Sequence, residues 1–333
     1  MTTWRGVART LAAAQRRSER EAARQQRELE KQQKLYDKMH ELERAAYEVE
    51  LYENHIEVLS SVHKDCGEEL QWEKIKEDNP PTKPTRSSNH ENKAQSTLDN
   101  YSPGLTDKLF RRVESKKAEL EKAIEDARTR DGQEYQDAVK EYEQMYADWE
   151  ASRELASSIL DGNIDAYVEA IKETDPFSEI KHLGSSIEFK ALDIHIIEAT
   201  LHVNNDIVIP REVKSLLRSG KLSIKDMTKS KFYELYQDYV CGCALRIARE
   251  LFALLPIEMA IINTVGMILN AKTGHMEEQP ILSVAIPGQT LSTLNFDSLD
   301  PSDSMENFVH NMKFRKTKGF DAVKRIQTSD LGI

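Results

Sequence analysis

The sequence has few cysteines, glycines and prolines for its length. Its 333 residues include three Cys, 13 Gly and 10 Pro. Three cysteines provide no disulfide framework, so we expect a reducing compartment and a cytoplasmic protein. The glycine-rich phosphate loops GxxxxGK and GxGxxG do not occur, and neither does a CxxC pair. The sequence therefore predicts no bound cofactor and no metal.

Long apolar runs are also scarce, and the mean hydropathy is −0.61. One run, 251–269, is almost long enough to span a bilayer, but it contains Pro256, Glu258 and Asn263. Because Pro breaks a helix and polar groups are costly in hydrocarbon, we expect a helix that ends at Leu255 and then a buried strand.

Residues 1–18 carry four Arg and no acid, with apolar residues at helical spacing. This pattern fits a basic membrane anchor or a transit-like peptide. A plain charged helix explains it better, because its apolar face is mostly alanine. We therefore expect no membrane partner.

Charge is abundant, with 46 Lys and Arg against 57 Asp and Glu, a net charge of −11. The acidic balance argues weakly against broad affinity for nucleic acid. The N-terminal part is rich in Glu, Lys, Arg, Gln and Ala, and residues 7–66 contain no Gly or Pro. Its apolar positions repeat every seven residues, at Leu35, Leu42, Val49 and Ile56. This is the heptad seam of a coiled coil, and its partner lies either in this chain or in another.

The composition changes at three places along the chain and so predicts four segments. These are an N-terminal charged helix with the heptad seam over 1–78, a disordered linker over 79–104, a helical hairpin or coiled-coil segment over 105–175, and an α+β domain over 176–333. The third segment has an aromatic row at helical spacing: Tyr135, Tyr142, Tyr146 and Trp149. Such rows can stack nucleobases, but the acidic neighbours favour helix packing.

The C-terminal part changes from helical spacing to alternation. Residues 187–191 and 197–203 alternate apolar and polar positions, which predicts half-buried strands. We further expect a return strand over 206–210, strands over 259–269 and 280–286, a central core helix over 229–255, and shorter helices over 163–174, 211–217, 288–294 and 301–314. The fold class is thus α+β, with a mixed or antiparallel sheet packed on a central helix. Within that helix, Arg246 and Glu250 are four residues apart and predict a salt bridge.

Glu188 and Lys190 are the strongest enzymatic candidates. On a strand both project from one face, the spacing of the Glu-x-Lys element in PD-(D/E)xK nucleases, where the carboxylate holds a metal and Lys positions or activates water. A further acid is needed, and Asp175 or Glu179 is available, although the sequence around them predicts a turn and a helix rather than a strand. The alternative, which we favour, is an exposed cross-strand ion pair.

The chain end is basic, with six Lys and Arg and a single acid in residues 313–325. The residues that we expect to contact phosphate or an acidic partner are Lys313, Arg315, Lys316 and Lys318. A solvated chain end is the favoured alternative.

No motif identifies a reaction. The sequence therefore favours a non-enzymatic scaffold or adaptor that self-associates or binds a protein partner through its helical region. The alternative is a metal-dependent nuclease-like or nucleic-acid-binding component that uses the C-terminal domain.

Overall fold

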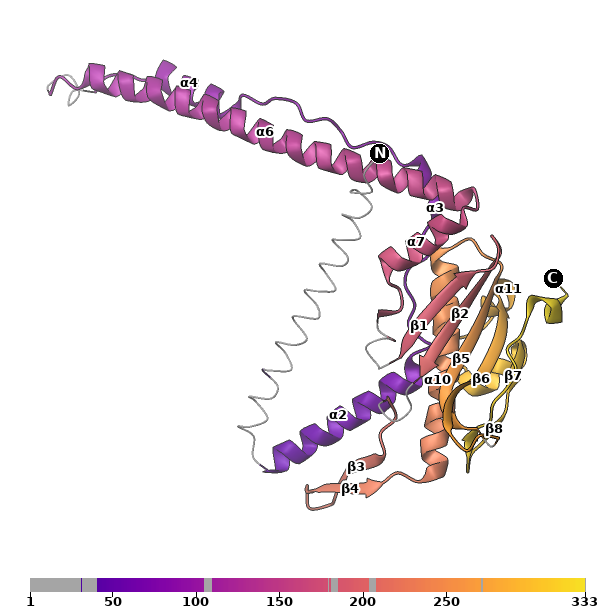
Figure 1. Cartoon of the computed structure of the whole chain (residues 1–333). Helices are drawn as coiled ribbons and strands as arrows, with labels where there is room; N and C mark the ends of the chain where they lie inside the picture. The colour runs from indigo at the N-terminus through magenta and orange to yellow at the C-terminus, as the bar shows by residue number, and fades with distance from the viewer. Residues whose placement is uncertain are drawn as a thin grey trace. The chain divides into compact units, whose positions relative to one another are not determined.

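The computed structural model (Figure 1) describes residues 31, 41–104, 110–178, 180, 185–203, 208–270 and 272–332. The chain separates into two compact units. Of the described residues, 74–155 form one unit, and those up to 73 together with 156–332 form the other. Each unit is described by itself.

A five-stranded mixed sheet is the centre of the larger unit. Its order is β1-β2-β5-β6-β7, where β1 is Ser186–Ala191, β2 Ile196–Val203, β5 Met259–Leu269, β6 Met276–Pro287 and β7 Val309–Met312. Strands β2 and β5 are parallel, and the other neighbouring pairs are antiparallel. The predicted α+β class with a mixed sheet is confirmed.

Helix α10 (Lys229–Leu254) packs on one face of this sheet, against β2, β5 and β6 (Figure 1). The Thr228 side chain accepts a hydrogen bond from the Lys231 N–H and so caps its N-terminus. Gly242 in its middle allows close packing, because a Cβ there would lie 2.9 Å from Cγ1 of Val62. The helix ends before Pro256, so the long apolar run is divided between α10 and β5 as predicted.

The C-terminal segment covers the opposite face of the sheet. Ile326 packs on Ile196, Ile261 and Ala285, and the short 3-10 helix η2 (Thr328–Leu331) adds Leu331 to this cluster. The sheet is therefore buried on both faces along β2, β5 and β6.

Helix α2 (Glu41–Ser61) packs against α10 and against a separate hairpin of β3 (Glu212–Leu216) and β4 (Leu222–Asp226). Arg249 of α10 holds the turn that follows α2, since its Nη1 donates to the carbonyl oxygens of His63 at 2.6 Å and Lys64 at 2.7 Å. Its guanidinium also lies 4.1 Å from the ring centroid of Phe296. The charge on Arg249 thus satisfies carbonyls that would otherwise lack a partner at a helix end.

A buried ion pair lies one turn along the same helix. Nε of Arg246 and Oε1 of Glu250 are 2.6 Å apart, and the two residues are only 7% and 5% exposed. The Glu250 carboxylate also accepts the backbone N–H of Gly67. The predicted salt bridge is confirmed, and it also connects α10 to the segment between α2 and α3 (Trp72–Glu77).

Several shorter elements complete this unit: α7 Ile164–Thr174, α11 Gly288–Leu291, α12 Pro301–Ser304, the 3-10 helix η1 Met305–Asn307, β8 Phe314–Arg315 and β9 Gly319–Phe320. Two predicted helices are wrong. The segment 211–217 forms β3, because a glycine turn at Gly220 (φ 78°) folds it against β4. The end of 301–314 forms β7, because β6 offers an edge for pairing. The predicted return strand begins outside the described residues, and its described part, 208–210, belongs to no strand.

The smaller unit contains α4 (Asn89–Asp99) and most of the 48-residue helix α6 (Val113–Leu160). Helix α6 continues through Asp131 and Gly132, so no hairpin turn forms there. Helix α4 falls within the predicted disordered linker. The Asp131 carboxylate accepts the backbone N–H groups of His90 at 3.1 Å and Glu91 at 2.9 Å, so α6 caps α4 across the unit. A composition window cannot detect a cap supplied 41 residues away.

These hydrogen bonds also keep Asp131 ionised. Burial acts to raise the pKa of this carboxyl, but hydrogen bonds from the backbone of Glu91 and His90 lower it by more, and the pKa lies below its ordinary value. A second link is the ion pair between Arg128 Nη2 and Glu91 Oε1, at 2.7 Å.

Among the residues that the structure describes, no helix combines the length and apolar content needed to cross a membrane.

Replacing Gly132 with Ala should stabilise α6. A Cβ at this position meets no atom within 4 Å, and Ala is better than Gly in a helix by about 0.5–1 kcal/mol. Thermal unfolding followed by circular dichroism should show a higher midpoint for the smaller unit. Gly162→Ala is the opposite case in the larger unit: it should lower the midpoint of that unit, because Gly162 has φ +74° and an added Cβ would lie 3.2 Å from Cγ2 of Ile194. A lower midpoint for Gly132→Ala would contradict the continuous helix.

Replacing Glu250 with Gln should lower the free energy of unfolding by about 3 kcal/mol, because a buried Arg246 loses its anionic partner. Urea denaturation measures this. The control is Glu258→Gln, whose side chain is 79% exposed beside His195 and should cost less than about 1 kcal/mol. Equal losses of unfolding free energy for the two substitutions would show that the buried pair stabilises the protein no more than an exposed pair does.

Candidate functional site

The heptad seam is divided between the interior and the surface. Val49 is 7% exposed and Ile56 is half-buried, both on the helix that packs against α10 and the hairpin. Leu42 is 53% exposed, and Leu35 lies outside the described residues. Val49 therefore packs against other elements of the same chain, and not against a second copy.

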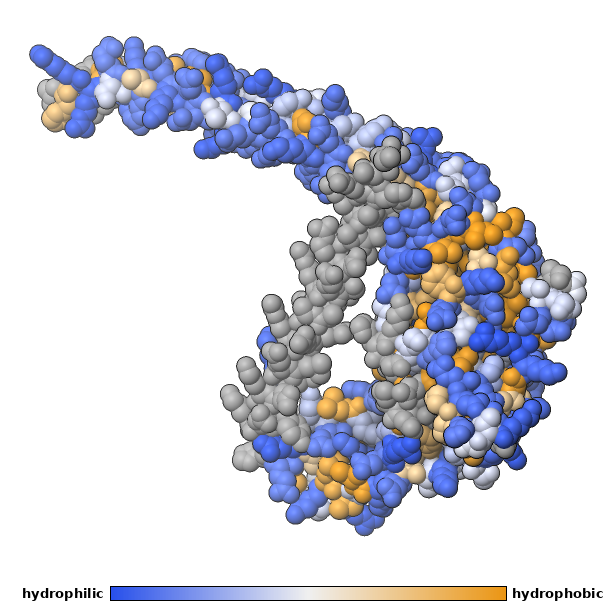
Figure 2. Space-filling view, viewed as in Figure 1, coloured by the Kyte–Doolittle hydropathy of each residue, from blue (hydrophilic) through white to orange (hydrophobic). Residues whose placement is uncertain are grey.

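A second set of apolar side chains on α2 and the hairpin points to solvent. Leu51 and Val58 are seven residues apart and each is 47% exposed. We define the α2–hairpin surface by its exposed apolar residues: Leu51 and Val58 of α2, and Leu216, Leu217 and Ile224 of the hairpin segment. Leu42 lies about 180° around α2 from Leu51, on the side that carries Val49, and is not part of this surface. Figure 2 shows hydrophobic residues among hydrophilic ones in the region where Figure 1 draws these elements. Exposed apolar patches that are surrounded by polar residues are typical of interaction surfaces.

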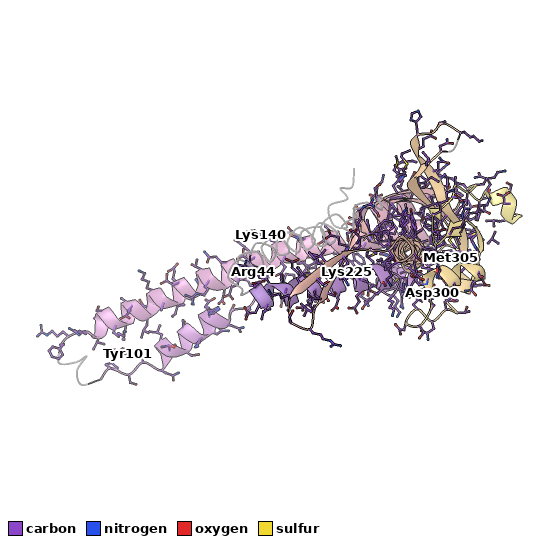
Figure 3. All side chains as sticks on the ribbon, turned by 90° about the horizontal axis from the view of Figure 1, so that it is seen from below. Arg44, Tyr101, Lys140, Lys225, Asp300 and Met305 are labelled. Atoms are coloured by element: carbon purple, nitrogen blue, oxygen red, sulfur yellow. The ribbon has the colours of Figure 1, made fainter. Side chains whose placement is uncertain are left out.

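Opposite charges lie on the two parts of this surface. Helix α2 contains six Glu and one Arg, whereas residues 211–226 contain five Lys or Arg and two acids. One pair is already formed within the chain, between Lys214 Nζ and Glu48 Oε2 at 2.9 Å. Figure 3 labels one basic residue on each element, Arg44 on α2 and Lys225 on β4. The surface thus combines an acidic half and a basic half.

The hairpin also has free strand edges. It is a two-stranded sheet, so among the described residues neither β3 nor β4 has a second neighbour. Unpaired edges offer backbone N–H and C=O groups to another strand.

The nuclease candidates lie on the edge of the main sheet. Strand β1 exposes Glu188 and Lys190 on one face, and Lys190 lies directly opposite Glu198 of β2. This register places an acid from a second strand beside the Glu-x-Lys element. It equally fits the cross-strand ion pair that the sequence favoured.

Glu198 is engaged in a hydrogen-bond chain across the sheet. Its Oε1 accepts from Asn263 Nδ2 at 2.7 Å, and Asn263 Oδ1 accepts from Ser283 Oγ at 2.7 Å. Ser283 Oγ in turn accepts the backbone N–H of Ile326 at 2.8 Å. This chain anchors the C-terminal segment on the sheet, so Glu198 has a structural task.

Asp175 caps the C-terminus of α7 in a left-handed conformation, with φ 40°. It lines a polar hollow of about 640 Å³ together with Arg246, Arg249 and Glu250. Glu179 lies outside the described residues. In the described part of the chain, neither Glu188 nor Asp175 belongs to a group of three side chains able to hold a metal. The nuclease hypothesis stays a prediction.

A second hollow of about 560 Å³ lies next to the polar hollow. The two share Cys66, Gly67 and Arg249 in their walls. Burial, and next the charge of Glu250, raise the pKa of the Cys66 thiol, so it is a poor nucleophile. Arg246, Arg249 and Glu250 of the lining already bind backbone atoms or one another. We therefore assign these hollows no chemistry.

The basic chain end is folded, although its basic side chains stay exposed to solvent. Its four candidate residues are Lys313, Arg315, Lys316 and Lys318. Arg315 Nη2 lies 2.7 Å from Asp321, and Lys318 also pairs with that carboxylate. Lys316 Nζ lies 2.9 Å from Glu234 of α10. These pairs neutralise part of the charge that phosphate contact would require.

The strands β8 and β9 hold this end against α10. Phe320 of β9 is 5% exposed, and its ring packs edge-on against Tyr236 at 5.2 Å and against Phe314 at 5.2 Å. The two aromatic residues of the basic end are therefore used for packing.

The sequence gives no indication of an acidic pair between α10 and the N-terminus of α12. Asp238 lies near Asp300, which caps α12 by accepting the N–H groups of Ser302 and Asp303. Figure 3 labels Asp300 and Met305 in this region. Burial, and next the charge of Asp300, raise the pKa of Asp238 to about 6. Residues 62 positions apart come together here through tertiary folding alone.

One further group escaped the sequence analysis. Among the described residues, His90, Asp131 and Glu134 are the one set of three potential ligands whose donor atoms all lie within 4.8 Å of one another. The spacing of Asp131 and Glu134 places both on one helix face, but nothing in the sequence connects them to His90.

Comparisons with known proteins provide no further guide. No family model matches this chain, and neither a curated protein nor a solved structure does.

Replacing Asp238 with Asn should make stability less dependent on pH. The folded-state pKa of about 6 exceeds the ordinary value of 3.8, so folding binds a proton between these values and stability falls as pH rises through that window. At pH 7 the variant should be more stable than the native protein by about 1 kcal/mol, after allowance for partial exposure, and equally stable near pH 4. Urea denaturation at both pH values measures this.

Asp297→Asn is the matched control, because Asp297 is an exposed acid of the same unit and its replacement should change neither value. If Asp238→Asn destabilises the protein at pH 7, the carboxylate is satisfied in its ionised form and the interpretation is wrong.

Proposed function

We propose that this protein is a non-enzymatic scaffold that self-associates through the α2–hairpin surface. The observation that carries the proposal is the coincidence of exposed apolar side chains and opposite charges on two elements that pack together. A reducing compartment such as the cytoplasm fits this function, since all three cysteines are free thiols.

A second copy of the chain is the partner that fits this surface best. In a two-fold symmetric dimer, each element on one copy contacts its counterpart site on the other. The acidic helix α2 of each copy can then face the basic hairpin of the other copy, so the dimer contains two equivalent α2–hairpin contacts. The same charges disfavour a symmetric contact of α2 with α2 alone, because six Glu would meet six Glu.

Apolar contact supplies the affinity in this arrangement, and charge supplies the orientation. Leu51 and Val58 keep the heptad spacing that allows a second helix to pack along α2. Their burial costs no core packing, because they already lie outside the interior. The open edges of β3 and β4 offer further pairing between copies.

Replacing both Leu51 and Val58 with Asp should weaken self-association. Sedimentation equilibrium and light scattering of the full chain should give a dimer for the native protein. The variant should have a dissociation constant at least about tenfold larger, because two charges would have to be desolvated in the interface. High salt should weaken the native dimer as well, since the opposite charges are exposed.

The matched control is Leu269→Asp with Met276→Asp, a pair of apolar residues that are 63% and 56% exposed at the end of the β5–β6 hairpin. It adds the same charge on another surface and should leave the dimer intact. Circular dichroism should show native helix content for both variants. A native protein that is monomeric at every concentration tested would refute the proposal.

A further inference from the structure

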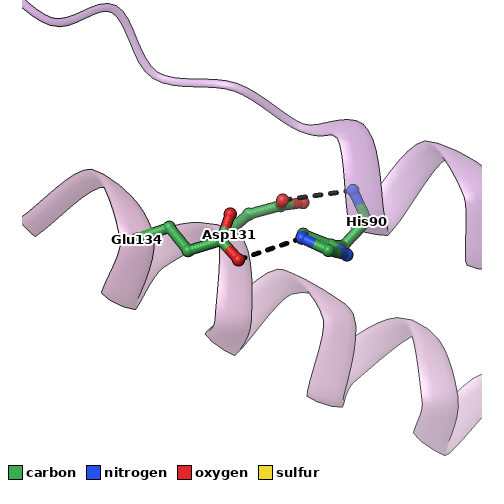
Figure 4. Close-up of side chains that lie close together, drawn as sticks. All are labelled: His90, Asp131 and Glu134. Carbon is green, nitrogen blue, oxygen red and sulfur yellow. Dashed lines mark hydrogen bonds and ion pairs between the residues drawn. The ribbon is translucent and has the colours of Figure 1, made fainter. Parts of the chain in front are cut away.

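Three side chains of the smaller unit converge from two helices (Figure 4). His90 lies in the first turn of α4, and Asp131 and Glu134 lie one turn apart on α6. The ring Nε2 of His90 is 3.0 Å from Oε1 of Glu134. The Asp131 carboxylate is bonded to the backbone N–H of His90 itself, at 3.1 Å.

The spacing of these donor atoms suits a small divalent ion. Ligands of a tetrahedral zinc ion lie about 2.0–2.2 Å from the metal, which puts them roughly 3.3 Å from one another. The donor atoms here lie within 4.8 Å, so small side-chain rotations bring them to that distance. The side chains of His90 and Glu134 are 38% and 61% exposed, which leaves them free to rotate and leaves a path for the ion.

The mixed nitrogen and oxygen set selects the class of metal. Magnesium and calcium prefer sites made of oxygen ligands alone, whereas zinc and related transition metals bind imidazole with carboxylates. Three protein ligands leave a fourth position for water.

Asp131 is held in place before any ion binds. It is 4% exposed, and two backbone N–H groups fix its carboxylate. A carboxylate has about four lone-pair sites, so two hydrogen bonds leave room for a metal bond. Such supporting hydrogen bonds orient the ligands of natural metal sites.

We propose that His90, Asp131 and Glu134 form a binding site for one zinc-class divalent transition metal ion. The ion replaces the hydrogen bond between His90 and Glu134 and crosslinks α4 to α6. The two carboxylates give the site a negative charge that attracts a divalent cation. The ion would thereby fix a helix that follows the proline-rich stretch, where packing contacts are few.

The test uses the full chain, freed of metal with a chelator and titrated with Co²⁺ as a spectroscopic probe and with Zn²⁺ by calorimetry. We expect one ion per chain at this site and a visible Co²⁺ absorption band. His90→Gln and Glu134→Gln should each weaken binding at least tenfold and remove the band. Both side chains are partly exposed, so neither variant threatens the fold; Asp131 is left unchanged because it caps α4.

The matched control is His195→Gln. His195 Nδ1 faces Glu258 at 3.3 Å, but this pair has no third ligand within the described residues, so the variant should bind like the native chain. A second readout is trypsin cleavage after Lys93 in α4, which Zn²⁺ should slow in the native chain and not in His90→Gln. Unchanged binding in His90→Gln and Glu134→Gln, or no binding by the native chain, would overturn the proposal.

Discussion

The larger unit depends on charged groups buried along one helix. Helix α10 is apolar enough to cover the sheet, yet it carries Arg246, Arg249 and Glu250 in its C-terminal half. Buried charges are costly unless they are paired, and here they are paired with one another and with the backbone that follows α2. Because those partners come from residues 63–67, the charged groups fix the position of α2 against the sheet domain. These ion pairs and hydrogen bonds offset the desolvation cost, and they join segments that are 183 to 186 residues apart in sequence.

The position of α2 in turn decides which of its residues are available to other molecules. The side that carries Val49 is filled by this chain, so it cannot serve a second copy. The exposed leucine and valine residues on α2 and on the hairpin remain. This is why we base self-association on the α2–hairpin surface and not on the heptad seam. Their charges give the surface two unlike halves, which is the condition for a symmetric contact between copies.

The smaller unit follows a different principle, because it has little apolar core. Helix α4 contains no buried residue, and its first turn is held by the Asp131 carboxylate and by the ion pair of Glu91 with Arg128. Interactions of this kind are few, and the ion pair is exposed to solvent, so a bound ion would add substantially to them. The same side chains that cap α4 also arrange the donors of the proposed metal site.

The sequence alone determined the periodic features of this protein. The alternation over 187–203, the long helix before Pro256, and the ion pair of Arg246 with Glu250 are all local patterns, and local patterns fix an element's type and exposed face. Tertiary structure decided the rest. A strand replaced the helix expected at 211–217 because Gly220 folds it onto β4, and α4 formed in a polar stretch because Asp131 caps it. The Asp238 pair and the His90 group also depend on contacts between distant residues. Such contacts produce no repeating pattern in the sequence, because each depends on only two side chains that are far apart along the chain.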